Sequence, residues 1–235
     1  MVLLSIIIPV YNEESTIRKV LEKVIDAEVK GIKKEIIVVE DFSTDNTRKI
    51  LKDILKLKKF QVNVFFHDRN MGKGSAIRTG LKNAKGDIML IQDADLEYNP
   101  EEYKKLLEPI LKGESDVVYG TRIEYIKANI RRMNLIHFIG NLFLTYITNL
   151  LYKSNITDME TGYKVFRKKI IDGIKLKSKR FDFEPEITAK ILKTGLKIHE
   201  IPVTFNARNF KEGKKITVLD GFKAAYCLVK FRFFD

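Results

Sequence analysis

Three carboxylates close together in the sequence could hold a metal ion. Asp93 and Asp95 come directly after an apolar segment, and Glu97 follows two residues later. Carboxylate oxygens are the ligands that Mg²⁺ and Mn²⁺ prefer, and such ions usually keep coordination positions for substrate phosphates. Without a cation, neighbouring carboxylates would repel one another. The alternative is a solvated acidic turn before a helix that begins near Pro100, because an isolated Asp-x-Asp sequence is common.

A second polar segment, residues 40–47, combines side chains that bind ligands with side chains that cap helices. Asp41 would accept hydrogen bonds from a ribose hydroxyl or a nucleobase, whereas Ser, Thr and Asp all cap helices well. We expect Asp45 or Ser43 to cap the following helix, which leaves Asp41 to contact a ligand.

A glycine-rich segment, residues 70–75, precedes another expected helix. Glycine lets the backbone at a helix N-terminus approach a phosphate closely, and Lys73 adds positive charge. The spacing differs from that of a P-loop, and an ordinary tight loop explains the segment equally well.

Alternating strands and helices would position these residues. Apolar and β-branched runs predict strands at 3–10, 35–39, 62–66, 87–92 and 117–119. Apolar residues at helical spacing predict helices at 13–29, 45–57, 75–84 and 100–111. The alternation predicts an α/β fold, a mostly parallel sheet with helices on both faces. Ligands bind such sheets beyond the carboxyl ends of the strands, so the polar residues that follow the strands should lie together.

Two apolar segments in the second half predict further, amphipathic helices. Residues 133–152 contain no Lys, Arg, Asp or Glu, and a narrow polar stripe runs along them through Asn141, Thr145 and Thr148. Residues 217–235 place apolar side chains on one face and Asp220, Lys223 and Lys230 elsewhere.

The composition limits the class of protein. The chain has 235 residues, 45% of them hydrophobic, which suits one α/β domain with a sizeable core. Its single cysteine, Cys227, excludes an intramolecular disulfide and fits a reducing compartment. The net charge of +12 favours anionic partners, although exposed lysines on helix surfaces explain part of it. A basic nucleic-acid-binding module is an alternative, but no recognition helix, zinc finger or RNA-binding signature supports it. We identify no signal peptide.

Together the motifs resemble the family 2 glycosyltransferases of the GT-A fold. The match rests on IPVYNE at 8–13, VEDFSTDNT at 39–47 and QDADL at 92–96, in that order and spacing. It continues through YGTR at 119–122, DMETGYK at 158–164, FDFEPE at 181–186 and IPV at 201–203. This later set is similar to the branch of dolichyl-phosphate mannose synthases and other polyprenyl-phosphate glycosyltransferases. The resemblance implies a glycosyltransferase domain over residues 1–216, followed by a C-terminal amphipathic helix at 217–235.

The resemblance also implies functions for single residues. Asp93, Asp95 and Arg122 would carry the catalysis, and Asp93, Asp95 and Glu97 would hold Mg²⁺ or Mn²⁺. The donor nucleotide would contact a larger set: Pro9, Tyr11, Glu13, Val39, Asp41, Lys73, Asp93 and Ala94. The donor diphosphate or the acceptor phosphate would meet four cations: Arg122, Arg131, Arg208 and Lys214. Phe42 departs from the family pattern, which usually has a glycine there, and the position of Glu97 is often a glutamine in mannose synthases.

The expected reaction transfers a sugar from a nucleotide diphosphate sugar to a polyprenyl phosphate such as dolichyl phosphate, with inversion at the anomeric carbon. The expected donor is GDP-mannose, and UDP-glucose is the alternative. The acceptor phosphate is anionic near neutral pH, with a second pKa of about 6, so it needs cations more than a general base. Arg131 could equally form a surface ion pair. Asp158, Glu160 and Glu184 are candidates for orienting sugar hydroxyls. A soluble or polysaccharide acceptor remains an alternative, and it would require a carboxylate base.

A lipid acceptor requires access to a bilayer. The asparagines and the histidine of residues 133–152 would be costly at the centre of a membrane, so we expect this helix to lie in the interface. The protein would then be peripheral, on the cytoplasmic face of the membrane. The alternative is that both amphipathic helices pack on the domain or on a second subunit of a homo-oligomer.

Overall fold

The computed structural model describes residues 1–57, 60–129, 135–208 and 218–234. In this part of the chain, seven strands form one sheet: β1 (Val2–Val10), β2 (Ile32–Glu40), β3 (Val62–Phe66), β4 (Ile88–Ile91), β5 (Val117–Thr121), β6 (Lys164–Arg167) and β7 (His199–Pro202). The helices are α1 (Ile17–Asp26), α2 (Thr47–Leu57), α3 (Lys73–Asn83), η1 (Pro100–Glu102), α4 (Tyr103–Leu111), α5 (Ile123–Ala128), α6 (Leu135–Tyr152), α7 (Lys168–Asp172), α8 (Phe183–Lys193) and α9 (Val218–Phe233).

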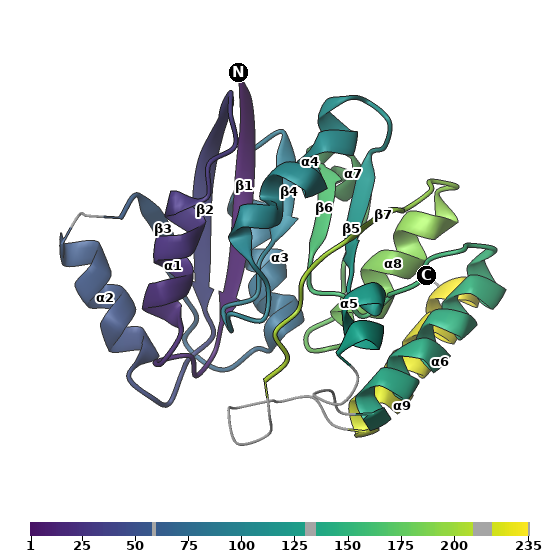
Figure 1. The fold of residues 1–235 in the computed structure, drawn as a ribbon. Helices are drawn as coiled ribbons and strands as arrows, with labels where there is room; N and C mark the ends of the chain where they lie inside the picture. The colour runs from purple at the N-terminus through teal and green to yellow at the C-terminus, as the bar shows by residue number, and fades with distance from the viewer. Residues whose placement is uncertain (58–59, 130–134, 209–217, 235) are drawn as a thin grey trace.

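The strand order is β3-β2-β1-β4-β6-β5-β7, and β6 is antiparallel to both of its neighbours. All other neighbouring strands run parallel, including β1 beside β2 and β4. The predicted mostly parallel α/β sheet is therefore confirmed. In Figure 1 the order of the chain reverses direction at β1, where β2 and β3 extend to one side and β4 to the other. Ligands bind at such a switch point, beyond the carboxyl ends of the strands.

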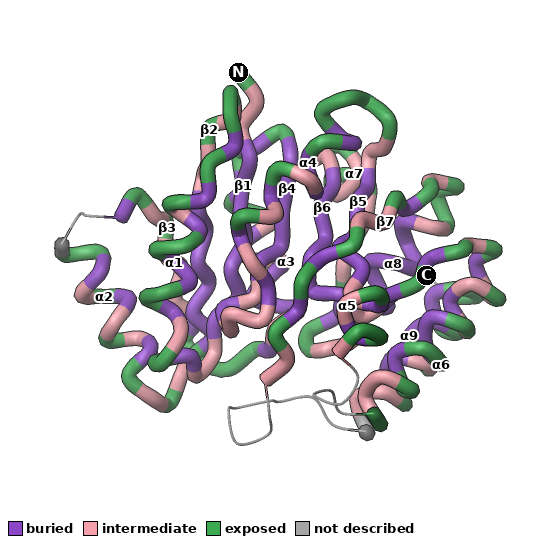
Figure 2. Tube along the Cα trace, in the orientation of Figure 1, coloured by how far each residue is buried: buried purple, intermediate pink, exposed green. Residues whose placement is uncertain are grey.

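Successive side chains of the central strands enter two different cores. Ile6 and Ile8 of β1 pack with α1, α2 and α4, whereas Ile7 packs with α3 and α8. The same alternation separates Val38 from Ile37 in β2. Side chains alternate across a strand, so a continuous apolar run is what a sheet covered on both faces needs. Figure 2 shows the central strands buried throughout their middle sections.

The second half of the chain differs most from the sequence-based prediction. The sequence did not predict β6, β7, α5, α7 or α8. The two strands are four residues long, and β7 is only partly buried, so neither produces a strong apolar pattern. The predicted helix at 13–29 is shorter in the structure, because α1 begins at Ile17 and ends at Asp26.

The two predicted amphipathic segments form α6 and α9, which lie side by side in Figure 1 and pack against each other. The polar stripe of α6 faces inward, with Asn141, Thr145 and Thr148 buried. Only 28% of α6 is buried, and its length and composition would suffice to cross a membrane. α9 also packs against α8, while the predicted domain boundary near residue 217 lies outside the described residues.

Candidate active site

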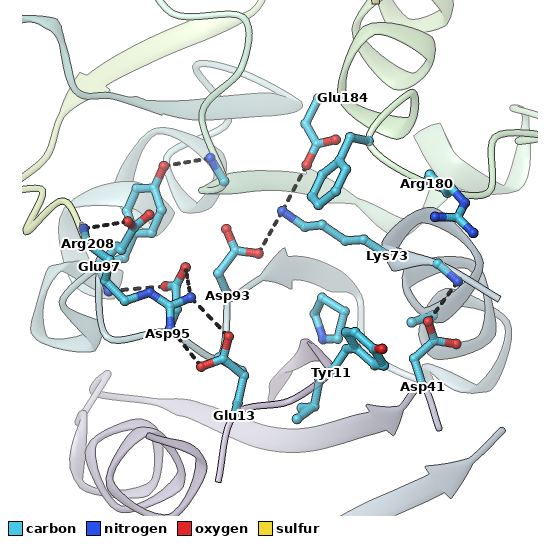
Figure 3. Close-up of a pocket in the computed structure, with 18 of the residues that line it drawn as sticks. Tyr11, Glu13, Asp41, Lys73, Asp93, Asp95, Glu97, Arg180, Glu184 and Arg208 are labelled. Carbon is cyan, nitrogen blue, oxygen red and sulfur yellow. Dashed lines mark hydrogen bonds and ion pairs between the residues drawn. The ribbon is translucent and has the colours of Figure 1, made fainter. Parts of the chain in front are cut away.

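A pocket of about 310 Å³ lies at the carboxyl ends of β1, β2, β4 and β5. The segments expected to meet there do so, and Figure 3 shows their side chains converging from different elements. The wall contains most of the predicted site residues: Pro9, Tyr11, Glu13, Asp41, Lys73, Asp93, Ala94, Asp95, Glu97, Arg122 and Arg208. Val39 is the exception among the described ones, because its side chain has no exposed surface and packs in the core with α3. Arg131 and Lys214 lie outside the described residues.

Lys73 joins two carboxylates across the pocket. Its Nζ lies 2.8 Å from Oδ1 of Asp93 and 2.9 Å from Oε1 of Glu184, as Figure 3 shows. Lys73 comes from the first turn of α3, and Glu184 from the first turn of α8. Burial alone would lower the pKa of Lys73, but the two carboxylates hold it well above its ordinary value. Lys73 is therefore a fixed positive charge beside Asp93.

Arg208 makes the matching contact on the other side. Its guanidinium donates two hydrogen bonds of 2.9 Å to Glu13 and one of 3.2 Å to Asp95. Its backbone N–H donates to Oε1 of Glu97 at 2.9 Å. Residues more than 110 positions apart thus meet at one point, and each carboxylate of the Asp-x-Asp motif faces a different basic side chain.

The carboxylates of this loop are close enough to disturb one another's ionisation. Burial raises the pKa of Asp95 to about 8, helped by the charges of Glu97 and Asp93 and opposed by Arg208. Burial also raises the pKa of Glu97. Leu96, between them, adopts a left-handed backbone with φ of 62°. A non-glycine residue in that conformation is costly and marks a locally constrained turn.

The fit of this site to a divalent cation rests on two carboxylates. Among the described residues, no three His, Cys, Asp or Glu side chains converge as a finished ligand set. Glu97 in particular is bonded to the backbone of Arg208. Asp93 and Asp95 supply hard oxygen donors in one pocket, and Mg²⁺ is commonly held by one or two carboxylates together with substrate phosphates. The residues therefore fit a cation that takes two ligands from Asp93 and Asp95 and its remaining ligands from a bound diphosphate.

Asp41 lines the pocket, but its carboxylate is already engaged. Oδ1 accepts hydrogen bonds from the backbone N–H of Met71 at 2.8 Å and from Nδ1 of His67 at 2.7 Å, and Oδ2 accepts one from Gly72 N–H at 2.7 Å. Asp41 therefore has protein partners that the sequence did not predict, because its carboxylate fixes the loop at 70–72, and its contact with the donor nucleotide stays a prediction. The predicted cap is confirmed, since Oδ1 of Asp45 accepts the N–H of Thr47 at 2.9 Å.

Phe42 takes the conformation that a glycine would favour. Its φ is 60°, in the left-handed region, the residue is 42% exposed, and the guanidinium carbon of Arg48 lies 5.4 Å from the ring centroid. Phe42 therefore adopts a left-handed backbone that glycine would adopt without strain.

The glycines of the 70–75 segment serve a protein loop. A Cβ on Gly72 would overlap the carbonyl oxygen of Lys179, and one on Gly74 would stand 2.9 Å from the carbonyl oxygen of Ser178. Ser75 N–H donates to the Lys179 carbonyl at 3.0 Å. Together with the bonds to Asp41, these contacts occupy amide groups that the sequence suggested for a phosphate. Asn70, Gly72 and Lys73 of this segment line the pocket, and Lys73 supplies its positive charge.

Arg122 lies in the pocket wall but is held by an acidic partner. Its Nε and Nη2 each donate to the Asp158 carboxylate at 2.7 Å, and its backbone N–H donates at 2.9 Å. Burial would raise the pKa of Asp158, yet the Arg122 charge and hydrogen bonds hold it below its ordinary value. An arginine has five N–H donors, so Arg122 can bind Asp158 and still offer donors to an anion.

Several wall residues carried no assigned function in the sequence-based prediction. Arg180 and Phe181 belong to the loop that rests on Gly72 and Gly74, and Figure 3 places Arg180 on the side of Asp41. Phe181 opens the FDFEPE motif at 181–186, whereas Arg180 precedes that motif and belongs to no motif identified in the sequence. The candidates for orienting sugar hydroxyls, Glu160 and Glu184, also line the pocket, and Oε1 of Glu160 and Oε2 of Glu184 are buried without a hydrogen-bond partner among the described residues.

Several known proteins are similar to this chain in sequence or in fold. The family model of glycosyl transferase family 2 matches residues 5–174. A UDP-N-acetylglucosamine–dolichyl-phosphate N-acetylglucosaminyltransferase of Methanococcus voltae is 31% identical, over 98% of this chain and 96% of its own length. A dolichol-phosphate mannosyltransferase of Pyrococcus furiosus is also 31% identical, over 97% of this chain but 64% of its own length.

A solved structure has the same fold. It is a glucosyl-3-phosphoglycerate synthase from Mycobacterium tuberculosis in complex with Mn²⁺, UDP and phosphoglyceric acid, with a TM-score of 0.74 and 19% identity, covering 100% of this chain and 80% of the other. The GT-A fold that the resemblance implied is confirmed. With the family motifs gathered around one pocket and a family match across most of the sheet, this chain belongs to glycosyl transferase family 2.

Proposed function

We propose that this protein transfers a sugar from a nucleotide diphosphate sugar to dolichyl phosphate, with the help of a divalent cation. The observation that carries the proposal is the set of charges that share one pocket: Asp93 is paired with Lys73, Asp95 is paired with Arg208, and Arg122 lines the same pocket. Two carboxylates suit a metal ion, and several fixed cations suit two phosphate-bearing substrates. Both relatives described above carry dolichyl- or dolichol-phosphate in their names.

The donor in this proposal is GDP-mannose, as the resemblance implies. The Pyrococcus furiosus mannosyltransferase supports it. UDP-N-acetylglucosamine is a second candidate, because the Methanococcus voltae relative matches this chain over almost its whole length. UDP-glucose remains the alternative derived from the sequence. The buried acceptor oxygens of Glu160 and Glu184 would receive hydrogen bonds from sugar hydroxyls or from an amide N–H, so they suit any of these donors.

The cation would be Mg²⁺ or Mn²⁺, held by Asp93 and Asp95. When bound, it would stabilise the negative charge that develops on the departing nucleoside diphosphate. The Mn²⁺ and UDP in the structure with the same fold support this part of the proposal. Lys73 would remain beside Asp93 and add a second positive charge on that side of the pocket.

The acceptor phosphate needs no strong general base, because it is already anionic near neutral pH. Arg122 and Arg208 would hold it and offset repulsion from the donor phosphates. Direct displacement at the anomeric carbon would invert its configuration. Because Arg122 and Arg208 line the same pocket as Asp93 and Asp95, both phosphates would be bound near the two carboxylates.

The proposal includes a peripheral position at the cytoplasmic face of a membrane. The bilayer would meet the outer sides of α6 and α9, which we call the α6–α9 face. Its apolar side chains are all exposed: Leu135, Ile136, Ile139, Leu142, Phe143, Tyr146 and Leu150 on α6, and Phe222, Tyr226, Val229, Phe233 and Phe234 at α9. Lys223, Lys230 and Arg232 are exposed on α9 and would meet anionic headgroups. The single cysteine fits a reducing compartment.

Product formation tests the function. The purified protein is incubated with Mn²⁺ or Mg²⁺, a short polyprenyl phosphate and labelled GDP-mannose, UDP-N-acetylglucosamine or UDP-glucose. Label that enters the organic phase with one donor, needs the metal and is lost in Asp95→Ala would support the proposal and name the sugar. Metal-dependent nucleotide binding without transfer to lipid from any donor would overturn the acceptor assignment.

Vesicle binding tests the membrane part separately. The protein should sediment with vesicles that contain anionic lipid, and a variant with Phe143→Ser and Tyr226→Ser should do so less. The alternative outcome is a stable dimer in solution that does not bind vesicles and that dissociates when the same two residues are substituted. That outcome would assign the α6–α9 face to a second copy of the chain.

A further inference from the structure

The inner side of α6 is bonded to the segment that forms part of the pocket wall. Asn141 Nδ2 donates to Oδ1 of Asp158 at 2.8 Å, and Thr145 Oγ1 accepts the backbone N–H of Met159 at 3.1 Å. Asn141 Oδ1 also accepts the N–H of Glu160 at 3.4 Å. The polar stripe that would be costly in a membrane therefore faces the domain and fixes residues 158–160.

Asp158 connects this contact to Arg122. Its side chain is completely buried and accepts four hydrogen bonds, three from Arg122 and one from Asn141. Arg122 is further confined by Phe205, whose ring centroid lies 4.9 Å from the guanidinium carbon. A planar guanidinium that binds a carboxylate through two nitrogens takes its orientation from that carboxylate. The Asn141 amide thus helps to set the direction in which Arg122 presents its remaining donors.

The same helix carries the apolar side chains of the α6–α9 face on its outer side. Ile139 and Phe143 are 56% and 58% exposed, whereas Asn141, between them in sequence, is 7% exposed. One rigid helix therefore links the surface proposed to meet the bilayer with the arginine proposed to meet the acceptor phosphate. The link consists of only two steps, Asn141 to Asp158 and Asp158 to Arg122.

We infer that Asn141 is a positioning residue for the acceptor phosphate: through Asp158 it orients Arg122, and it ties that orientation to helix α6. The inference rests on the proposed function, because it takes the anion at Arg122 to be the phosphate of the lipid acceptor. Loss of the Asn141 amide leaves Asp158 with donors from Arg122 alone, so the carboxylate and the guanidinium can rotate together. Binding of the acceptor then weakens, whereas the donor nucleotide, on the Asp41 side, keeps its contacts.

Asn141→Leu tests this step, with Thr148→Val as the matched control. Thr148 lies on the same helix and is fully buried, but its hydroxyl donates only to the Leu144 carbonyl of α6 at 2.8 Å. We expect Asn141→Leu to raise the KM for polyprenyl phosphate about tenfold, as befits one lost hydrogen bond to a charged group. The affinity for the nucleoside diphosphate with Mn²⁺ should stay unchanged, and Thr148→Val should change neither quantity.

A double-mutant cycle separates positioning from a general loss of stability. In an Arg122→Lys background the bidentate pair with Asp158 is absent, so Asn141→Leu should have little further effect on the KM for lipid. Equal effects of Asn141→Leu in both backgrounds, or equal effects of Asn141→Leu and Thr148→Val, would overturn the inference while the proposed function stands. A wild-type protein that forms no lipid-linked product with any donor would overturn the proposed function, and this inference with it.

Discussion

Gly162 lies directly against Asp93, with no room for a side chain between them. A Cβ on Gly162 would overlap Oδ2 of Asp93 and stand 2.9 Å from Cε2 of Tyr98. The Gly162 N–H also donates to the Tyr98 hydroxyl at 2.7 Å, so the backbone has little freedom to retreat. We expect Gly162→Ala to displace the Asp93 carboxylate and reduce transfer activity by about 10²-fold, the effect of misplacing a reacting group by about 1 Å.

Gly140→Ala is the control for this change. Gly140 lies in α6, and a Cβ there would meet nothing within 4 Å. Alanine favours a helix over glycine, so this variant should fold at least as well as the wild type and keep its activity. Titration with Mn²⁺ in the presence of a nucleoside diphosphate would locate the defect in Gly162→Ala. Wild-type metal affinity in that variant would contradict the explanation.

Gly72→Ala should destabilise the fold more than Gly31→Ala does. Both glycines have positive φ, 91° and 76°, so both alanine variants carry a backbone cost of at least about 1 kcal/mol, and Gly72 carries more because its ψ of 160° lies in a region that essentially only glycine adopts. Only Gly72 adds a clash with the Lys179 carbonyl and with Cγ of Arg180, 2.7 Å away, whereas a Cβ on Gly31 meets nothing within 4 Å. Denaturant unfolding measures the difference between the two variants. Equal losses of stability would show that the Lys179 loop moves aside without cost.

The sequence was sufficient to predict which segments meet at the site. Polar residues that follow parallel strands must gather at one edge of the sheet, and Tyr11, Asp41 and Asp93 do so. What each side chain binds could not be predicted in the same way, because it depends on contacts between distant segments. Asp41 illustrates this, since its partners come from residues 67–72 and exist only once β3 lies beside β2.

The second half of the chain was harder to predict for the same physical reason. The pairing of Arg122 with Asp158 depends on β5 lying beside the antiparallel β6, and short strands of four residues leave almost no periodic pattern. The polar stripe of α6 was visible as a pattern, but its purpose was not. Only the structure shows that Asn141 and Thr145 bind the 158–160 segment.

Lys73→Gln should lower stability, and Mn²⁺ should restore part of it. The substitution removes the charge that Asp93 and Glu184 share, and the carboxyl group of Glu184 is buried. Removing one partner of a buried ion pair typically costs about 3–5 kcal/mol, and the 21% exposure of the Lys73 side chain places this case toward the low end. A cation bound to Asp93 would replace the lost charge, so Mn²⁺ should raise the melting temperature more in the variant than in the wild type.

Lys82→Gln serves as the control for the Lys73 variant. Lys82 lies in the last turn of the same helix, α3, and is exposed to solvent. Its removal should change stability by no more than about 0.5 kcal/mol, with the wild-type response to Mn²⁺. Thermal unfolding with and without the metal measures both variants. An identical response to Mn²⁺ in Lys73→Gln and Lys82→Gln would refute the idea that Lys73 and a metal ion neutralise the same carboxylate.

Cys227 should make the protein less stable as the pH rises above about 9. The thiol is 6% exposed, and burial, together with the charges of Asp182 and Glu186, raises its pKa to about 12 from an ordinary value of 9.0. Between these values the unfolded chain loses the thiol proton while the folded chain keeps it, so deprotonation favours unfolding in that window. Unfolding free energies at pH 8 and pH 10.5 should therefore differ less in Cys227→Ala than in the wild type, by roughly 1–2 kcal/mol. The cavity that the alanine leaves costs the same at both pH values, so its cost cancels from the difference.

Alkylation of the folded protein by iodoacetamide at pH 8 should also be far slower than alkylation of the unfolded chain. Rapid alkylation under native conditions, with the same pH dependence of stability in both proteins, would show that the thiol ionises as if it were in solvent.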